Sequence, residues 1–226
     1  MAGQNGITPV RNVPSRYDAQ VPRFLIGLLA IRAFAQTAAV GEFSHAADIG
    51  DPPLKGAAEF NADTKEYKIT GTGADIWGQA DQFHYVWREM SGNFAITATA
   101  KFLTGGNAHR KAVIMVRKTV DADSPFVHLA IHGDGLAAVQ FRNAKADTTN
   151  TVDFPIEGPG IWRLKLQRRG STITVWIGQE GAPLRELGHT MVPLSGAVLA
   201  GLGVSSHTKE GLTSVLFSGV TVEVLR

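Results

Sequence analysis

The 226-residue sequence contains no cysteine. This absence excludes disulfide bonds, zinc sites built from thiolates and cysteine nucleophiles, and it leaves the redox compartment of the protein open. A long hydrophobic run is also missing, because the longest apolar stretch, residues 24–31, is too short to span a bilayer. The Gly-x-Ser-x-Gly turn of serine hydrolases is missing as well. These absences favour a protein that does not span a membrane and is not a catalyst, although they leave an enzyme open.

The part of the chain expected to fold carries no excess of positive charge, although the pI of the sequence is about 9.0. Residues 1–36 hold four arginines and one aspartate of the 22 basic and 20 acidic residues, which leaves 18 basic and 19 acidic residues beyond them. A nearly neutral domain lacks the basic surface that binds phosphate backbones. The sequence therefore predicts no nucleic-acid partner.

The segment Pro22–Gln36 has the pattern of a secretory signal. A basic residue precedes the apolar run, and Ala33-Phe34-Ala35 follows it as a small-x-small cleavage site. We therefore expect a leader over residues 1–40, a single domain over 41–226, and a protein that is secreted or lies in the periplasm or cell envelope. The alternative is an amphipathic N-terminal helix that packs on the domain.

Short segments of alternating polarity fill the rest of the chain. In residues 71–102, Phe83, Tyr85 and Trp87 alternate with polar residues, a turn follows at residues 90–93, and a second alternating segment ends at Phe102. A period of two residues is typical of strands with two different faces. About eleven such segments, separated by turns rich in glycine, predict an all-β, two-sheet antiparallel sandwich.

Several motifs along the chain carry a resemblance to a known family. They are Gly71-Thr72-Gly73, Ile76-Trp77, Asp81-x-Phe83-x-Tyr85-x-Trp87, Lys111-Ala112, Met115, Arg117, Gln140-x-Arg142, Trp162-Arg163-Leu164, Gly201-Leu202 and Ser206-His207. With them, residues 43–226 resemble bacterial concanavalin A-like lectin and glucanase-type domains, which are laminin G-like jelly rolls. The resemblance implies a jelly-roll sandwich with a concave ligand face, commonly exported and linked to carbohydrate binding, but it does not imply an activity. Glucanase relatives carry paired carboxylates on one strand, and this sequence has no such run.

Strand alternation assigns the candidate ligand residues to one face. On residues 111–118, Ala112, Ile114 and Val116 share one face and Arg117 lies on the other. If the apolar set points between the sheets, the polar set stands on the outer, concave face, with an exposed tryptophan as a stacking plate. The predicted ligand-binding residues are Trp77, His84, Arg88, Arg117, His128, Gln140 and Arg142. The alternative is that these are ordinary solvated side chains.

The same alternation limits aromatic and metal sites. Trp87 shares a face with Phe83 and Tyr85, which predicts core packing and leaves Trp77 as the best candidate for an exposed ring. His128 and His132 are four residues apart on a strand, so their rings lie about 13 Å apart and cannot share one ion. Oxygen donors that could bind a structural calcium ion are the carboxylates of Asp48, Asp51, Asp121 and Asp123, and the sequence predicts no other cofactor.

Three functions follow from these observations. The first is a non-catalytic, exported sandwich that binds a polysaccharide, glycan or other extracellular polymer on its concave sheet. The second is a structural or protein-interaction sandwich, including a homo-oligomer that pairs through an edge strand or outer face. The third is a glycoside hydrolase or lyase of the same fold, which requires two carboxylates in the concave groove.

Overall fold

The computed structural model describes residues 39–158 and 160–226. The predicted leader, including Pro22–Gln36, therefore lies outside the described residues except for its last two positions. The described part of the chain consists of strands, turns and loops, and holds no helix. Within it, no helix is long and apolar enough to cross a membrane.

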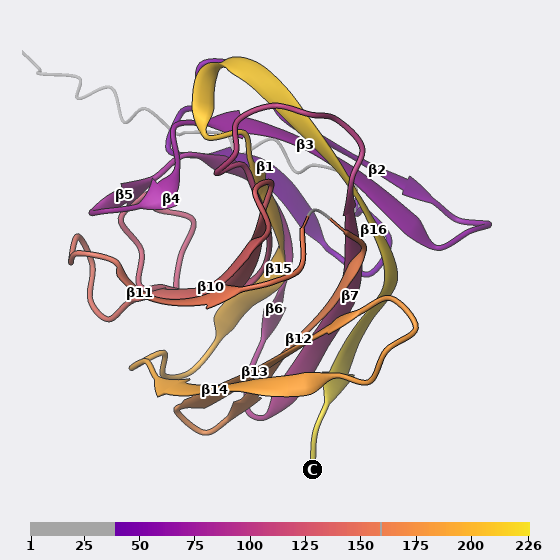
Figure 1. The fold of residues 1–226 in the computed structure, drawn as a ribbon. Helices are drawn as coiled ribbons and strands as arrows, with labels where there is room; N and C mark the ends of the chain where they lie inside the picture. Colours follow the sequence, from indigo (N-terminus) through magenta and orange to yellow (C-terminus); the bar gives the residue numbers. More distant parts are fainter. Residues whose placement is uncertain (1–38, 159) are drawn as a thin grey trace, which may run out of the picture. The chain divides into compact units, whose positions relative to one another are not determined.

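Two seven-stranded antiparallel sheets form the domain, and we call them the first and the second sheet (Figure 1). The strands of the first sheet, in spatial order, are β1 (His45–Ile49), β6 (Phe83–Met90), β15 (Val198–Ser205), β8 (Lys111–Arg117), β9 (Phe126–His132), β10 (Leu136–Arg142) and β11 (Asn150–Pro155). The strands of the second sheet are β14 (Arg185–Met191), β13 (Thr172–Gln179), β12 (Trp162–Arg169), β7 (Phe94–Phe102), β16 (Thr208–Val224), β3 (Glu66–Gly73) and β2 (Ala57–Asn61). A separate hairpin pairs β4 (Ile76–Trp77) with β5 (Ala80–Asp81).

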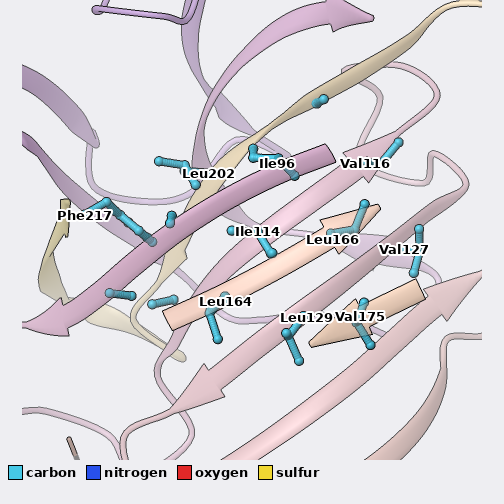
Figure 2. Close-up of a cluster of buried hydrophobic side chains, with 14 of the residues drawn as sticks. Ile96, Ile114, Val116, Val127, Leu129, Leu164, Leu166, Val175, Leu202 and Phe217 are labelled. Atoms are coloured by element: carbon cyan, nitrogen blue, oxygen red, sulfur yellow. The ribbon is translucent and has the colours of Figure 1, made fainter. Parts of the chain in front are cut away.

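The main core lies between the two sheets. Figure 2 shows Ile114 and Leu129 of the first sheet in one cluster with Ile96 and Leu164 of the second sheet, and all four are fully buried. Burial of each such side chain stabilises the fold by about 1.5–3 kcal/mol. The predicted all-β jelly-roll sandwich of two antiparallel sheets is confirmed.

Some edge strands escape prediction because they lack the alternating pattern. β11 at the edge of the first sheet and β14 at the edge of the second are mostly exposed on both faces. β1, the other edge of the first sheet, has the weakly apolar sequence HAADI. An edge strand can be short and polar because hydrogen bonds to its single neighbour hold it in place. The hydrophobic signal therefore marks the central strands better than the edges.

A second buried cluster lies on the outer face of the first sheet, away from the second sheet. Phe83, Tyr85 and Trp87 of β6 pack there. They are buried as predicted, but on the face opposite to the core between the sheets. The Tyr85 and Trp87 rings stack at 5.3 Å, and the Tyr85 hydroxyl donates to the Leu199 carbonyl at 3.0 Å. Gly203 of β15 makes room for Phe83, because a Cβ there would lie 2.9 Å from the ring.

Candidate functional site

The β4–β5 hairpin covers part of the outer face and is held there by Asp81. The Asp81 carboxylate accepts from Arg142 at 2.7 and 3.1 Å and lies 3.4 Å from Arg117, and all three side chains are fully buried. Burial raises the pKa of Asp81, and the two guanidinium groups oppose that rise. Arg142 also donates to the Gly78 carbonyl in the hairpin turn. These ion pairs fasten the hairpin to the sheet.

Arg117 and Arg142 lie on the face that the sequence assigns to a ligand, but they do not reach solvent. Arg117 donates to the carbonyls of Thr119 and Asp121, and its guanidinium lies 5.2 Å from the Phe83 ring centroid. Their predicted role as ligand contacts is therefore corrected. The hairpin residue Asp81 and the backbone carbonyls of the loop after β8 take up their charges, so the two arginines serve the fold.

An open pocket of about 460 Å³ lies beside the covered part of this face, and we call it the outer-face pocket. This volume is in the range of small-molecule sites. The pocket is lined by Asp75, Trp77, His109, Lys111, His132, Leu136, Gln140, Thr151, Asp153 and His207. These residues come from β4, β8, β9, β10 and β11 and from three loops at one end of the first sheet. The pocket thus combines an aromatic ring with amide, hydroxyl, imidazole, ammonium and carboxylate groups.

Trp77 forms the aromatic wall of the outer-face pocket. It is 39% exposed, as predicted, whereas Trp87 and Trp162 are buried. It lies on the two-residue strand β4, next to the turn at Gly78, where its side chain is exposed. The Lys111 ammonium lies 5.9 Å from the ring centroid. An exposed ring beside polar groups is a suitable surface for a flat, amphipathic ligand.

Lys111 organises the floor of the outer-face pocket. Its buried ammonium donates to Asp75 at 2.6 Å, to the Gln140 side-chain oxygen at 3.0 Å and to the Ile76 carbonyl at 3.2 Å. Burial lowers the pKa of Lys111, and the Asp75 carboxylate opposes this shift. The second Asp75 oxygen lies 3.3 Å from His207 Nε2. Asp75 therefore joins the turn after β15 to strand β8.

Gln140 lies beside a buried histidine of the neighbouring strand, His128. His128 Nε2 lies 2.9 Å from the Gln140 side-chain oxygen, which already accepts from Lys111, so this nitrogen of His128 carries a proton and donates. The Gln140 amide nitrogen donates to Thr151 at 3.5 Å. Burial lowers the pKa of His128 well below its usual value, and the Lys111 charge adds to that shift. His128 thus positions Gln140 from the neighbouring strand β9, and because it is fully buried it lies out of reach of a ligand.

Three histidines border one end of the outer-face pocket. The rings of His109 and His132 lie 6.0 Å apart and meet edge to face, and the rings of His109 and His207 lie 5.4 Å apart. His132 is buried, which lowers its pKa to about 4, so it is neutral at pH 7. This end of the pocket therefore offers imidazole groups in addition to the charged network around Lys111.

His84 and Arg88 lie on the opposite face of β6 from the outer-face pocket, which corrects their predicted position. On β15 they pair with Val204 and Ala200, whose side chains belong to the core between the sheets. His84 Nδ1 lies 2.8 Å from Asp48, and Arg88 pairs with Glu42 at 3.4 Å. Because the aromatic residues of β6 take the outer face, the alternation sends these two polar residues to the inner face.

The four predicted calcium ligands do not gather around one point. Asp48 accepts from the Gly56 backbone nitrogen at 3.0 Å and pairs with His84, and this hydrogen bonding lowers its pKa although burial acts in the opposite direction. The Lys145 ammonium lies 2.7 Å from Asp121 and 2.9 Å from Asp123. These two carboxylates therefore already neutralise a cation of the chain. Asp51 lies on an exposed loop, and its φ is 49°.

Of the seven predicted ligand-binding residues, the structure brings Trp77 and Gln140 together in the outer-face pocket. Sequence reasoning missed Asp75, His109 and His207 because they lie on loops far apart in the chain. Lys111 and His132 carried a usable signal, since alternation puts them on the same face as Gln140 and strand pairing sets them side by side. Thr151 and Asp153 belong to the strand β11 that the sequence did not reveal.

Comparisons with known proteins bear on the fold. No protein-family model matches the chain, and no curated protein matches it in sequence. A functionally unknown protein from Saccharomyces cerevisiae has a similar structure, with a TM-score of 0.62 and 15% identity over 81% of this chain and 98% of that one.

Two further similar structures come from bacilli. The carbohydrate binding module CBM66 from Bacillus subtilis matches with a TM-score of 0.54 and 14% identity over 82% of this chain and 97% of that one. The GH43 protein BlXynB from Bacillus licheniformis matches with a TM-score of 0.56 and 12% identity. The match covers 71% of this chain and 33% of that protein. At these identities the likeness is one of fold: the chain shares its β-sandwich with a carbohydrate-binding module and with part of a GH43 protein.

Proposed function

We propose that the protein binds a carbohydrate in the outer-face pocket without cleaving it. The observation that carries this proposal is the exposed ring of Trp77 at the wall of a pocket lined by polar side chains. Sugars present an apolar ring face with hydroxyl groups around its edge. Trp77 provides the stacking surface, and the polar groups opposite it provide donors and acceptors for hydroxyls.

The polar groups of the pocket differ in how free they are to meet a ligand. Lys111 and the oxygen of Gln140 are already bonded within the protein, and they fix the floor. Asp153 is exposed and accepts from Thr151 at 2.7 Å, which leaves further acceptor positions on its carboxylate. His207 is partly exposed at the rim. We therefore propose that the floor residues fix the shape of the pocket and that the rim residues form hydrogen bonds with the sugar.

Similarity of fold supports this proposal. A carbohydrate-binding module shares the sandwich over nearly its whole length. The proposal does not depend on that likeness alone, because a fold hosts many functions and the pocket belongs to this chain.

The hydrogen bonding of Asp75, one of the two pocket carboxylates, favours binding over hydrolysis. A glycosidase needs one carboxyl group that gives a proton and a second that acts as base or nucleophile. One Asp75 oxygen accepts from Lys111 and from the Ile76 backbone nitrogen at 2.7 Å, and the other faces His207. Asp75 is thus held as an acceptor, which suits a structural role better than that of a proton donor.

A screen against a glycan array and insoluble polysaccharides tests the proposal. We expect a hit that weakens at least about tenfold in Trp77→Ala, equivalent to about 1.4 kcal/mol. Trp176→Ala is the matched control, because Trp176 lies on β13 of the second sheet beneath Lys165, whose ammonium is 5.0 Å from the ring centroid. Sugar release from the hit, or equal loss of binding in both variants, would contradict the proposal.

Export of the chain, through the segment Pro22–Gln36, stays a prediction that agrees with an extracellular glycan as ligand. Homo-oligomerisation through an edge strand likewise stays a prediction. Sedimentation of the purified chain, with and without the hit from the screen, measures it directly.

A further inference from the structure

A second kind of site lies at the histidine end of the outer-face pocket. His109, His132 and Asp134 each offer one ligand atom, and these three atoms lie within 4.8 Å of one another. His109 Nδ1 and Asp134 Oδ2 are 3.5 Å apart. Within the described residues, this is the one group of three histidine, aspartate or glutamate side chains that meets such a distance limit.

The backbone brings these three residues together through strand pairing. Lys111 of β8 and His132 of β9 are direct partners in the first sheet. His109 precedes Lys111 by two residues and Asp134 follows His132 by two, so both lie just beyond the same paired end. The Gly133 nitrogen donates to the Arg110 carbonyl at 3.1 Å, and Gly135, with φ of 87°, closes the turn. Strand pairing and this backbone hydrogen bond therefore bring the turns that carry His109 and Asp134 together.

His132 supplies an independent observation. Its side chain is only 6% exposed, and neither of its ring nitrogens has a hydrogen-bond partner among the described residues. Buried polar groups are nearly always paired, because an unpaired one loses its bonds to water without replacement. The imidazole lies edge to face with His109, so its unpaired nitrogen is available beside a second imidazole and a carboxylate.

The donor set indicates the class of ion. Two imidazole nitrogens and one carboxylate oxygen suit zinc and neighbouring divalent transition metals, whereas calcium and magnesium prefer sites made of oxygen alone. Ligands about 2.0–2.2 Å from zinc at tetrahedral angles lie roughly 3.3–3.6 Å from one another. The 3.5 Å between His109 and Asp134 already fits this value, and small rotations of exposed side chains bring the rest within it.

We propose that His109, His132 and Asp134 form a binding site for Zn²⁺ or a similar divalent transition metal at the rim of the outer-face pocket. Three protein ligands leave a fourth position, which a water molecule or a pocket ligand fills. Two buried cations lie near the site. The Lys111 ammonium is paired with Asp75 at 2.6 Å, and the Arg110 guanidinium packs against Gly133 and donates to the carbonyls of Gly106 and Asn107. The proposal stands on this geometry and does not rest on carbohydrate binding.

Metal binding to the untagged, full-length chain tests the site without any sugar. After treatment with a chelator and its removal, Zn²⁺ is titrated by calorimetry, and Co²⁺ is titrated by visible absorption. We expect one equivalent per chain, a cobalt spectrum of four- or five-coordinate form, and a rise in melting temperature with Zn²⁺. His132→Gln and Asp134→Asn each weaken binding at least tenfold.

His189→Gln is the control, because His189 is an exposed histidine on β14 of the second sheet. It leaves the affinity unchanged if the proposal is right. If His132→Gln does not fold, His109→Gln gives the same test, since His109 is exposed and its loss leaves the sheet intact. Absence of saturable binding up to about 0.1 mM metal, or equal affinity in His109→Gln and wild type, overturns the proposal.

Discussion

The outer face of the first sheet carries charged and aromatic side chains in two regions that differ in what covers them. In the covered region, Asp81, Arg117 and Arg142 lie fully buried beneath the β4–β5 hairpin. In the outer-face pocket, Trp77 and Asp153 of the same face reach solvent. Residue types that suggest a ligand site therefore stabilise the fold in one region and are free to bind in the other.

The largest loss of stability in the covered region is expected for Asp81→Asn. This change leaves Arg117 and Arg142 buried without a counter-charge, and we expect a loss of about 3–5 kcal/mol in the free energy of unfolding. Urea denaturation at pH 7 measures it. A loss below about 1 kcal/mol would mean that the backbone hydrogen bonds of the hairpin hold it without the ion pairs.

Acid weakens the fold through His128, which hydrogen-bonds with Gln140 of the pocket floor. Burial lowers its pKa well below the ordinary 6.5, so as the pH falls below that value the unfolded chain takes up this proton before the folded chain does. The free energy of unfolding therefore falls as the pH falls below about 6.5, by at most about 1.4 kcal/mol per pH unit for this one group.

Comparison with His128→Gln isolates the contribution of His128, because the variant cannot take up that proton. Urea denaturation of both proteins at pH 7 and pH 5 gives the difference. An identical pH dependence in the two proteins would contradict the assignment of a neutral, buried imidazole.

A smaller loss of stability in the covered region is expected for Tyr85→Phe. The Tyr85 hydroxyl donates toward two carbonyls, of Leu199 at 3.0 Å and Met115 at 3.2 Å, and no water reaches it. Its removal leaves the ring packing intact, so we expect a loss of about 1 kcal/mol in stability. Thermal unfolding of the variant gives this value, and a gain in stability would show that the hydroxyl is not well paired.

The smallest effect is expected for Asp153→Asn in the outer-face pocket. Asp153 is exposed on the edge strand β11, so its neutral replacement changes stability by no more than about 0.5 kcal/mol. It belongs to the proposed sugar contacts, and we expect weaker binding of the glycan hit at unchanged melting temperature. A loss of stability as large as that of Asp81→Asn would contradict the claim that only the covered region stabilises the fold.

The sequence predicts the central strands and fails at their faces for a physical reason. β12 alternates clearly between buried and more exposed positions, but β6 is buried on both sides, with Phe83 and Val86 equally inaccessible. In such a strand the period of two survives while the difference between inside and outside is lost. His84 and Arg88 were therefore predicted on the wrong face of β6.

The candidate site was predictable only in part. Trp77 stands out in sequence because turns flank it, and Gln140 follows from alternation on β10. Asp75, His109 and His207 meet only because three loops converge at one end of the first sheet. The burial of Arg117 likewise cannot be predicted from the polarity pattern of its own strand, since it depends on where the β4–β5 hairpin folds back.

Hydrogen–deuterium exchange of the full chain, with and without the glycan found by the screen, tests most directly whether the outer-face pocket is the binding site. The account predicts slower exchange in the segments 74–80, 105–111 and 205–209, which carry Trp77, His109 and His207. A second pocket, lined by His84, Gly56 and Phe60, lies at the edge of the sandwich. Protection confined to segments 56–60 and 84–88, with none around Trp77, would contradict the account.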